Sequence, residues 1–338
     1  MIQSCVEGRR DDVVLRVLAY HRVAEIHSNR AVDDRSISAT PAAFREQLRH
    51  VARHYRCVSM PEVLDAIERN GPLPRRAILI TFDDGYADFA EIAWPILRKF
   101  GLAATMFVPT AFPDHPERVF LSDKLYQAFC STFRMRLADT PLGPLSWVTC
   151  EERERALRAL QDHVTTTSNE KAMELVDYVC GQLTEQPVMV GSVLTWNQLR
   201  QLAREGLTIG SHSRTHRIIT RLCPDQIREE IQSSQRDLKR EIGVALPIFC
   251  YPNGNHNNEA AAVLKEEAIK VAFTTIPSRN ELGVMDPLKL GRTCITPRSS
   301  LAIFSARLQR VGTQLDAWRH RKLKETLTRS FPQIQSNG

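Results

Sequence analysis

Residues 77–86 read AILITFDDGY, an apolar run that ends in two adjacent carboxylates and a glycine. The first six residues are apolar apart from Thr81, which is typical of a parallel strand buried on both faces. Asp83 and Asp84 therefore follow directly after a predicted strand. In α/β barrels the loops at the carboxyl ends of the strands meet at one mouth and carry the catalytic groups. Taken alone, Asp-Asp-Gly is also a common chain-reversing turn.

Further β-rich runs are separated by segments with helical periodicity, the pattern of repeated βα units in a mostly parallel sheet. The other predicted strands are residues 13–19, 103–109, 207–211, 246–251, 270–276 and 288–295. Helix ends are marked between them by the pairs Thr40–Pro41 and Thr195–Gln198 and by Gly101 and Gly243. These signals together predict an α/β barrel.

Residues 113–193 interrupt this pattern, because they are rich in helical signals and poor in strand signals. We interpret them as a helical insertion that either shapes a substrate groove or is a peripheral elaboration. Residues 10–112 and 194–300 are then predicted to form the barrel together. Residues 301–338 are predicted to form a C-terminal helical extension.

A second polar motif, SHSRTH at residues 211–216, also follows a predicted strand. His212 and His216 are four residues apart, so that a helical turn would present both imidazoles on one side. Two imidazoles and one carboxylate form the three-ligand set of a catalytic zinc site. Neighbouring residues in an extended chain point in opposite directions, so one of the two aspartates can bind the metal while the other acts as a base.

The composition excludes several other classes of protein. Over 338 residues, 45 basic and 39 acidic side chains give a net charge of +6, too small and too dispersed to predict a nucleic-acid partner. No apolar stretch is long enough to cross a bilayer, and no export signal is visible, so we expect a cytoplasmic protein. A basic cluster at residues 319–324 is either a solvated helix face or a weak peripheral contact with a membrane.

The two motifs resemble those of the polysaccharide deacetylases, the NodB-homology family that is also called carbohydrate esterase family four. The family's TFDDG motif matches residues 81–85, and its H-S/T-x-x-H motif matches residues 212–216. Further similarity lies in YHRV, ATMFVP, YPNGN and KVAFTT, at residues 20–23, 104–109, 251–255 and 270–275.

The resemblance implies a distorted (β/α)7 barrel, similar to a TIM barrel, that hydrolyses an acetamido group on a sugar. It further implies that Asp83 is the general base. Asp84, His212 and His216 would bind a divalent metal, with zinc expected and cobalt, nickel or manganese as alternatives.

The third family motif, R-x-P-Y-G, differs in this chain. Cys250 stands where the family has an arginine that orients the base, and no other residue is assigned to that role. Asn253 stands where the family has a tyrosine whose backbone N–H stabilises the oxyanion. Because a backbone donor does not depend on the side chain, Asn253 keeps this expectation, and we group Tyr251 with it as a substrate or oxyanion contact.

The family's C-terminal L-x-H motif, which supplies the general acid, is also missing: residues 290–292 read LGR. The YHRV segment resembles the branch that acts on poly-N-acetylglucosamine, in which an early histidine takes over this task. The resemblance therefore assigns His21 as the general acid, with a histidine packed at a strand end as the alternative. Tyr20, Arg22 and Arg292 are interpreted as residues that line the substrate groove.

The sequence thus predicts a metal-dependent hydrolase that removes N-acetyl groups from amino sugars of a polysaccharide, oligosaccharide or glycan precursor. One alternative is a metal-dependent amidohydrolase that acts on a small non-sugar amide. Another is a carbohydrate-binding protein with impaired catalysis, suggested by the missing arginine and histidine. Asp83 argues against this last alternative, because a binding protein has no need of a free base beside its metal.

Overall fold

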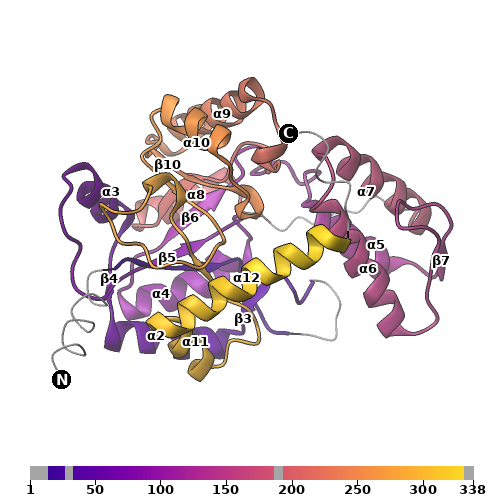
Figure 1. Ribbon diagram of the computed structural model, residues 1–338, viewed down its shortest axis with the longest axis horizontal. Helices are drawn as coiled ribbons and strands as arrows, with labels where there is room; N and C mark the ends of the chain where they lie inside the picture. Colours follow the sequence, from indigo (N-terminus) through magenta and orange to yellow (C-terminus); the bar gives the residue numbers. More distant parts are fainter. Residues whose placement is uncertain (1–13, 27–32, 186–192, 331–338) are drawn as a thin grey trace. The chain divides into compact units, whose positions relative to one another are not determined.

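The structure, a computed structural model, describes residues 14–26, 33–185 and 193–330. The chain divides into two compact units (Figure 1). The first comprises residues 1–26, 35–114 and 193–326, and the second comprises residues 27–34, 115–192 and 327–338. The N-terminal residues before Val14 and the polar tail at 333–338 lie outside the described residues.

A curled sheet organises the first unit, with its strands in the order β11-β10-β9-β6-β5-β1-β12 and β4 paired with β5. Each of these described pairings is parallel. Leu290 also bridges to Phe273 of β11, so the segment that leads into β12 contacts both edges of the sheet. The strand bounds are β1 Arg16–Tyr20, β4 Arg56–Cys57, β5 Ala77–Phe82, β6 Thr105–Val108, β9 Thr208–Ser211, β10 Ile248–Cys250, β11 Val271–Phe273 and β12 Thr293–Cys294.

The predicted strand at 77–82 is present with the same bounds. The strand in the run 13–19 begins later and ends one residue beyond it, at Tyr20, and each of the other runs contains a shorter strand. The last run, 288–295, is the one that differs most from the prediction. Pro287–Lys289 forms a 3-10 turn (η4) capped by the Asp286 side chain. In the rest of the run, Leu290 forms an isolated bridge and Thr293–Cys294 forms the short strand β12. The prediction was wrong there because the apolar pattern concealed this capped turn.

The helices that alternate with these strands along the chain cover the sheet. Thr40 caps its helix by accepting a hydrogen bond from Ala43 N, and Thr195 forms the predicted capping box. The helix bounds are α2 Pro41–His54, α3 Met60–Glu68, η1 Phe89–Ala93, α4 Trp94–Phe100, α8 Trp196–Arg204, η2 Ile219–Arg221, α9 Pro224–Ile242, η3 Pro252–Gly254, α10 Asn258–Glu266 and α11 Leu301–Arg307. A separate two-stranded parallel sheet pairs β2 Arg22–Val23 with β3 Ile37–Ala39.

Both faces of β5 are buried, as its continuous apolar sequence predicts. Ile78, Ile80 and Phe82 pack in one core cluster with residues of α2 and α4. The alternate residues, Ala77 and Leu79, pack in a second cluster with side chains from β6, β10 and β11 on the inside of the curled sheet. The strand is therefore fixed from both sides, and the residues that follow it start from a rigid position.

The second unit is a small helical assembly with its own apolar core. Its helices are α5 Leu121–Ser131, α6 Cys150–Val164 and α7 Asn169–Leu183, and its hairpin pairs β7 Arg136–Leu137 with β8 Leu145–Ser146. Phe129, Trp147 and Leu160 are among the buried residues at its centre.

The last helix, α12, spans Arg310–Ser330 and presents an exposed apolar and basic surface. Trp318 is about half exposed, and the Lys322 ammonium lies 5.6 Å from the centre of its ring. Membrane contact through this helix stays a prediction.

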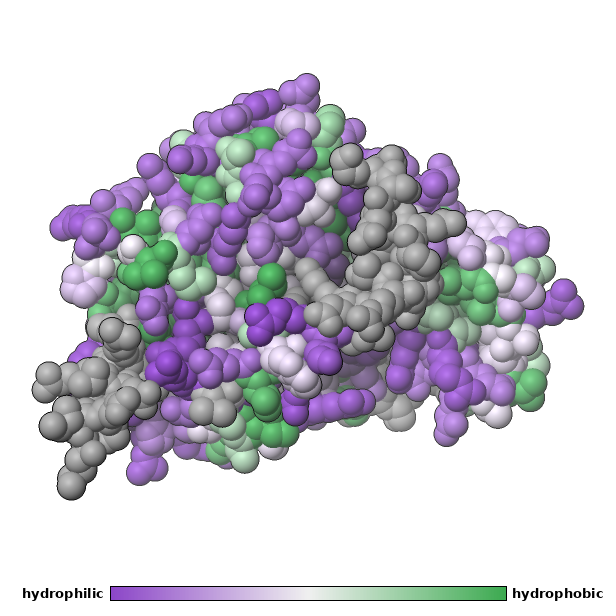
Figure 2. Space-filling model, in the orientation of Figure 1, coloured by the Kyte–Doolittle hydropathy of each residue, from purple (hydrophilic) through white to green (hydrophobic). Residues whose placement is uncertain are grey.

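No helix in the described ranges is both long and apolar enough to span a bilayer. On the face drawn in Figure 2, hydrophilic residues are widespread and apolar patches lie between them.

We predict that Gly210→Ala destabilises the fold by about 1–3 kcal/mol, because an added methyl group would overpack the sheet. Its Cβ would lie 2.8 Å from Ile248 Cδ1 and from the Phe107 ring. Urea unfolding measures the loss. Gly71→Ala is the control, since nothing lies within 4 Å of its added Cβ, and equal stability of the two variants would contradict the prediction.

Candidate active site

The parallel register brings the ends of the central strands to one edge of the sheet. Aligned Cα pairs at or near these ends are Tyr20 with Phe82, Phe82 with Met106, Val108 with Ser211 and Ser211 with Phe249. His21, Asp83 and His212 are the next residues along their strands, so they leave the sheet at the same edge. Two stretches more than 100 residues apart in sequence therefore meet, as expected for the catalytic mouth of an α/β barrel.

Asp83 is almost fully buried and forms a bidentate ion pair with Arg292. The two guanidinium nitrogens donate to the two carboxylate oxygens at 2.8 and 2.7 Å, and Arg292 has no exposed surface. The same guanidinium also donates to Thr81 Oγ1 and to the carbonyl of Thr274. Because four hydrogen bonds hold the guanidinium, the orientation of the Asp83 carboxylate is fixed.

Burial alone would raise the pKa of Asp83. The charges of Arg292, His212 and His21 and the hydrogen bonds from Arg292 outweigh burial, so the pKa lies well below its usual range. Asp83 is therefore ionised at pH 7. Cys250 lies 3.7 Å from the same oxygens, but burial raises the pKa of its thiol well above the ordinary value, so this neighbour stays neutral.

Asp84 adopts a left-handed backbone conformation, with a φ of 73°, and Gly85 follows with a φ of 71°. The expectation that neighbouring residues of an extended chain separate the two carboxylates was wrong: the turn at Asp84 separates them. A non-glycine residue in this conformation costs about 1–2 kcal/mol. Such strain persists only where the surroundings impose it, and it is concentrated at functional sites.

His212 has a defined tautomer. Its Nδ1 lies 2.8 Å from the carbonyl oxygen of Cys250, and since a carbonyl can only accept, Nδ1 must carry the proton. Burial lowers the pKa of His212 to about 4, despite the opposing charges of Asp83 and Asp84, so the ring is neutral at pH 7. The lone pair of Nε2 is therefore available to a ligand.

Three acceptor groups converge at this point. Asp84 Oδ1 lies 3.5 Å from His212 Nε2 and 3.3 Å from His216 Nε2, and ligand atoms of these residues all lie within 4.8 Å of one another. Within the described residues Asp84 Oδ1 is buried without a hydrogen-bond partner. A buried carboxylate oxygen that faces the lone pair of a neutral imidazole is unfavourable unless a cation lies between them. The donor set fits a divalent metal.

A second group that could hold a metal consists of Asp83, His212 and Cys250. We favour the Asp84 group for two reasons. Both oxygens of Asp83 already accept from Arg292, whose positive charge would repel a cation there. The raised pKa of Cys250 also keeps sulfur as a thiol, whereas the metal-binding form is the thiolate.

The loop at residues 212–216 is not the helical turn that the spacing of the two histidines predicted. Ser213 and His216 have φ values of 61° and 59°, whereas a right-handed helical turn requires negative φ. Ser213 Oγ accepts a hydrogen bond from His216 N at 3.0 Å, which closes the loop. The two imidazoles are still brought together, with ring centres 4.9 Å apart.

A second buried ion pair fixes the segment next to His21. Asp88 Oδ2 accepts from Arg22 Nε at 2.6 Å, and Asp88 Oδ1 accepts from Val23 N at 3.1 Å. The Arg22 guanidinium also lies 4.5 Å from the centre of the Tyr86 ring. The YHRV segment is thus attached to the loop that carries the two aspartates, with His21 itself only partly buried.

Four interpretations from the sequence need correction. Arg292, Tyr20 and Tyr251 have no exposed surface, so their side chains cannot line a groove or reach a substrate. The hydroxyl of Tyr20 donates to Gln47 and that of Tyr251 to the carbonyl of Leu288. Arg22 is 8% exposed and pairs with Asp88. Asn253 is exposed in the turn η3, with a φ of 57°, and its oxyanion contact stays a prediction.

The comparisons with known proteins identify the family. The sequence profile of the polysaccharide deacetylases matches residues 70–122 and 149–272, just over half of the chain. The chain therefore belongs to the polysaccharide deacetylase family, as the motifs predicted. The poly-β-1,6-N-acetyl-D-glucosamine N-deacetylase of Escherichia coli (strain K12) is 32% identical over 111 residues. This match covers 32% of the chain but only 16% of that protein.

Solved structures share the fold. The deacetylase PplD of Streptococcus pyogenes, solved in complex with acetate, has a TM-score of 0.57 and 19% identity, over 86% of this chain and 95% of that chain. IcaB from Ammonifex degensii has a TM-score of 0.54 and 19% identity, over 87% of this chain and 96% of that chain. The predicted α/β class, with a distorted (β/α)7 barrel, is confirmed.

We predict that Arg292→Met destabilises the protein by about 3–5 kcal/mol, because it leaves the Asp83 carboxylate buried without a partner. Urea unfolding at pH 7 measures this loss. The control is Arg49→Met, whose guanidinium pairs with Glu46 on the surface and should contribute at most about 1 kcal/mol. Similar losses in the two variants would show that the buried pair has no special role.

Proposed function

We propose that this protein is a metal-dependent deacetylase that hydrolyses the N-acetyl group of an amino sugar within a polysaccharide, oligosaccharide or glycan precursor. One observation carries the proposal: Asp84, His212 and His216 converge beside a second carboxylate, Asp83, that is ionised and oriented by Arg292. A ligand set and an oriented base in one place are what hydrolysis of an amide requires.

Asp84, His212 and His216 would hold the metal. When bound, a divalent cation supplies Lewis acidity, which polarises the acetyl carbonyl and makes a nearby water easier to deprotonate. We propose zinc, because two imidazole nitrogens and one carboxylate oxygen are a usual zinc set that leaves a position open. Cobalt, nickel and manganese are the alternatives to compare.

Asp83 would act as the general base that takes a proton from the attacking water. Its low pKa makes it a weak base in ordinary water, so the water must be acidified for the transfer to succeed. The ion pair with Arg292 holds both carboxylate oxygens in one orientation. Asp83 would therefore stay ionised and correctly oriented to accept the proton.

His21 would act as the general acid that protonates the leaving nitrogen. Two observations support this role: His21 follows β1 at the same sheet edge as Asp83, and its charge is among the causes that lower the pKa values of Asp83 and Asp84. The attachment of Arg22 and Val23 to Asp88 limits the movement of the segment.

The alternative of a binding protein without catalysis rested on the missing arginine and histidine. Arg292 weakens that argument, because a guanidinium contacts the base from a different part of the chain. The substrate class is proposed from the family and from the E. coli relative, which is named as a deacetylase of poly-β-1,6-N-acetyl-D-glucosamine.

We expect the purified chain to release acetate from N-acetylglucosamine oligomers, to lose this activity with a chelator and to regain it with added zinc. The panel should include β-1,6- and β-1,4-linked oligomers and small cyclic amides. Hydrolysis of the small amides with no acetate from any glycan would contradict the proposed substrate class. Activity that resists complete removal of metal would contradict the proposed chemistry.

The proposed roles predict different effects of two substitutions. Asp83→Asn and His21→Ala should each lower kcat by about 10²-fold or more, with zinc still bound, because each removes one proton transfer. His54→Ala, an exposed histidine of α2, is the control and should be fully active. Wild-type kcat in a correctly folded Asp83→Asn variant would exclude Asp83 as the base.

A further inference from the structure

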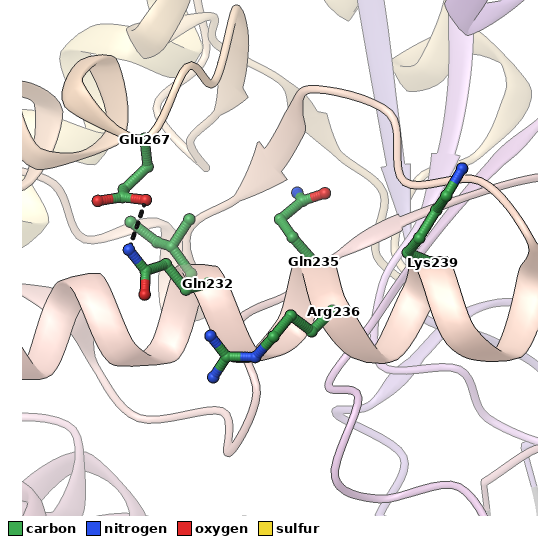
Figure 3. A pocket seen from close by; sticks show the side chains of 6 residues that line it. Gln232, Gln235, Arg236, Lys239 and Glu267 are labelled. Carbon is green, nitrogen blue, oxygen red and sulfur yellow. Dashed lines mark hydrogen bonds between the residues drawn. The ribbon is translucent and has the colours of Figure 1, made fainter.

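Helix α9 buries a polar stripe as well as an apolar one. Its buried polar residues recur at the spacing of one helix face: Glu230, Ser233, Ser234 and Asp237. Figure 3 shows a different side of the same helix, where Gln232, Gln235, Arg236 and Lys239 line a shallow hollow and Gln232 donates to Glu267. Buried polar groups need partners, so the stripe must contact other polar groups.

Glu230 contacts the loop that carries the two histidines. Its Oε2 accepts hydrogen bonds from the backbone N–H groups of Arg214 and Thr215, each at 2.8 Å. Its Oε1 accepts from the Thr215 hydroxyl. One carboxylate therefore satisfies three donors of the segment between His212 and His216, and hydrogen bonds to a charged acceptor are the strong ones.

Two other residues of the stripe, Ser234 and Asp237, contact segments at the ends of two neighbouring strands, β9 and β6. Ser234 Oγ lies 2.7 Å from Ser211 Oγ at the end of β9. Asp237 accepts from the hydroxyl of Thr110, beyond the end of β6, at 2.9 Å. The Arg214 guanidinium approaches the same Asp237 carboxylate at 3.5 Å. The helix thus holds the base of the loop while Glu230 holds its middle.

The loop needs such support because its backbone is strained. Ser213 and His216 both adopt the left-handed conformation, which is costly for residues other than glycine. Without the Glu230 carboxylate, three donors would lose their acceptor, and the loop could relax to ordinary φ values. His216 would then move relative to His212 and Asp84.

We propose that Glu230 is a positioning residue that keeps His216 in the geometry needed to bind the metal. This inference rests on the proposed metal site, and it concerns affinity for the metal rather than the identity of the substrate. Groups that orient the ligands of a metal commonly change its affinity by about 10–100-fold when they are removed.

The test compares zinc affinity in three variants, measured by competition with a chromophoric chelator. Glu230→Ala removes all three acceptors and should weaken zinc binding by about 10–100-fold. Glu230→Gln keeps one oxygen for the two N–H groups and should fall between this variant and the wild type. Glu229→Ala is the control: the residue is next in sequence and on the same helix, but it is exposed, and its loss should leave the affinity unchanged.

A folded Glu230→Ala or Glu230→Gln variant with wild-type zinc affinity would overturn the inference. If Glu230→Ala does not fold, the affinity of Glu230→Gln decides the question. The measurement needs no substrate, so a wild-type protein that binds zinc but releases no acetate would refute the proposed function alone. Failure of the wild type to bind zinc would refute both.

Discussion

Two adjacent carboxylates, Asp83 and Asp84, are buried together in an interior that does not tolerate two uncompensated charges. Arg292, which is itself fully buried, neutralises Asp83 through two short hydrogen bonds. The second faces imidazoles, of which His212 is neutral at pH 7, and its Oδ1 has no hydrogen-bond donor among the described residues. The same constraint therefore gives the two neighbouring carboxylates different surroundings: Asp83 pairs with Arg292, whereas Asp84 faces the two imidazoles. Our proposal that Asp83 is the base and Asp84 a metal ligand rests on this difference.

The fold supplies this arrangement in layers. The parallel strands bring the two aspartates and the two histidines to one edge of the sheet. Apolar packing on both faces of β5 fixes the position from which Asp83 and Asp84 start. Polar contacts from other parts of the chain then orient the site residues. Arg292 donates hydrogen bonds to Asp83, and Glu230 accepts hydrogen bonds from the loop between the two histidines. Two strained residues, Ser213 and His216, belong to the loop that Glu230 contacts.

The sequence could predict the strands, the motifs and the family, because these depend on local patterns of apolar and polar residues. The partner of Asp83 was not predicted, because Arg292 is 209 residues away and local sequence does not reveal such a contact. An arginine inside an apolar run that reads LKLGRTCI was a signal, since a buried guanidinium needs a carboxylate. Glu230 and Asp88 were missed for the same reason.

The backbone at Asp84, Ser213 and His216 was also beyond prediction. Positive φ is uncommon for residues other than glycine, although aspartate and histidine adopt it more often than most, and local sequence does not reveal where tertiary contacts impose it. The spacing of His212 and His216 alone suggested a helical turn. A loop with positive φ values at Ser213 and His216 brings the two imidazoles together instead. Tyr20, Arg22 and Arg292 were assigned to a groove, and Tyr251 to a substrate or oxyanion contact, because the position of a residue in a motif does not report its burial.

The most direct test of the division between the two aspartates is a crystal structure of the zinc-loaded protein, with anomalous diffraction recorded at the zinc edge. We expect one anomalous peak about 2.0–2.2 Å from ligand atoms of Asp84, His212 and His216, with the Asp83 carboxylate still paired to Arg292. A peak coordinated by Asp83 or Cys250, or an Asp83 that has left Arg292 to bind the metal, would contradict this account.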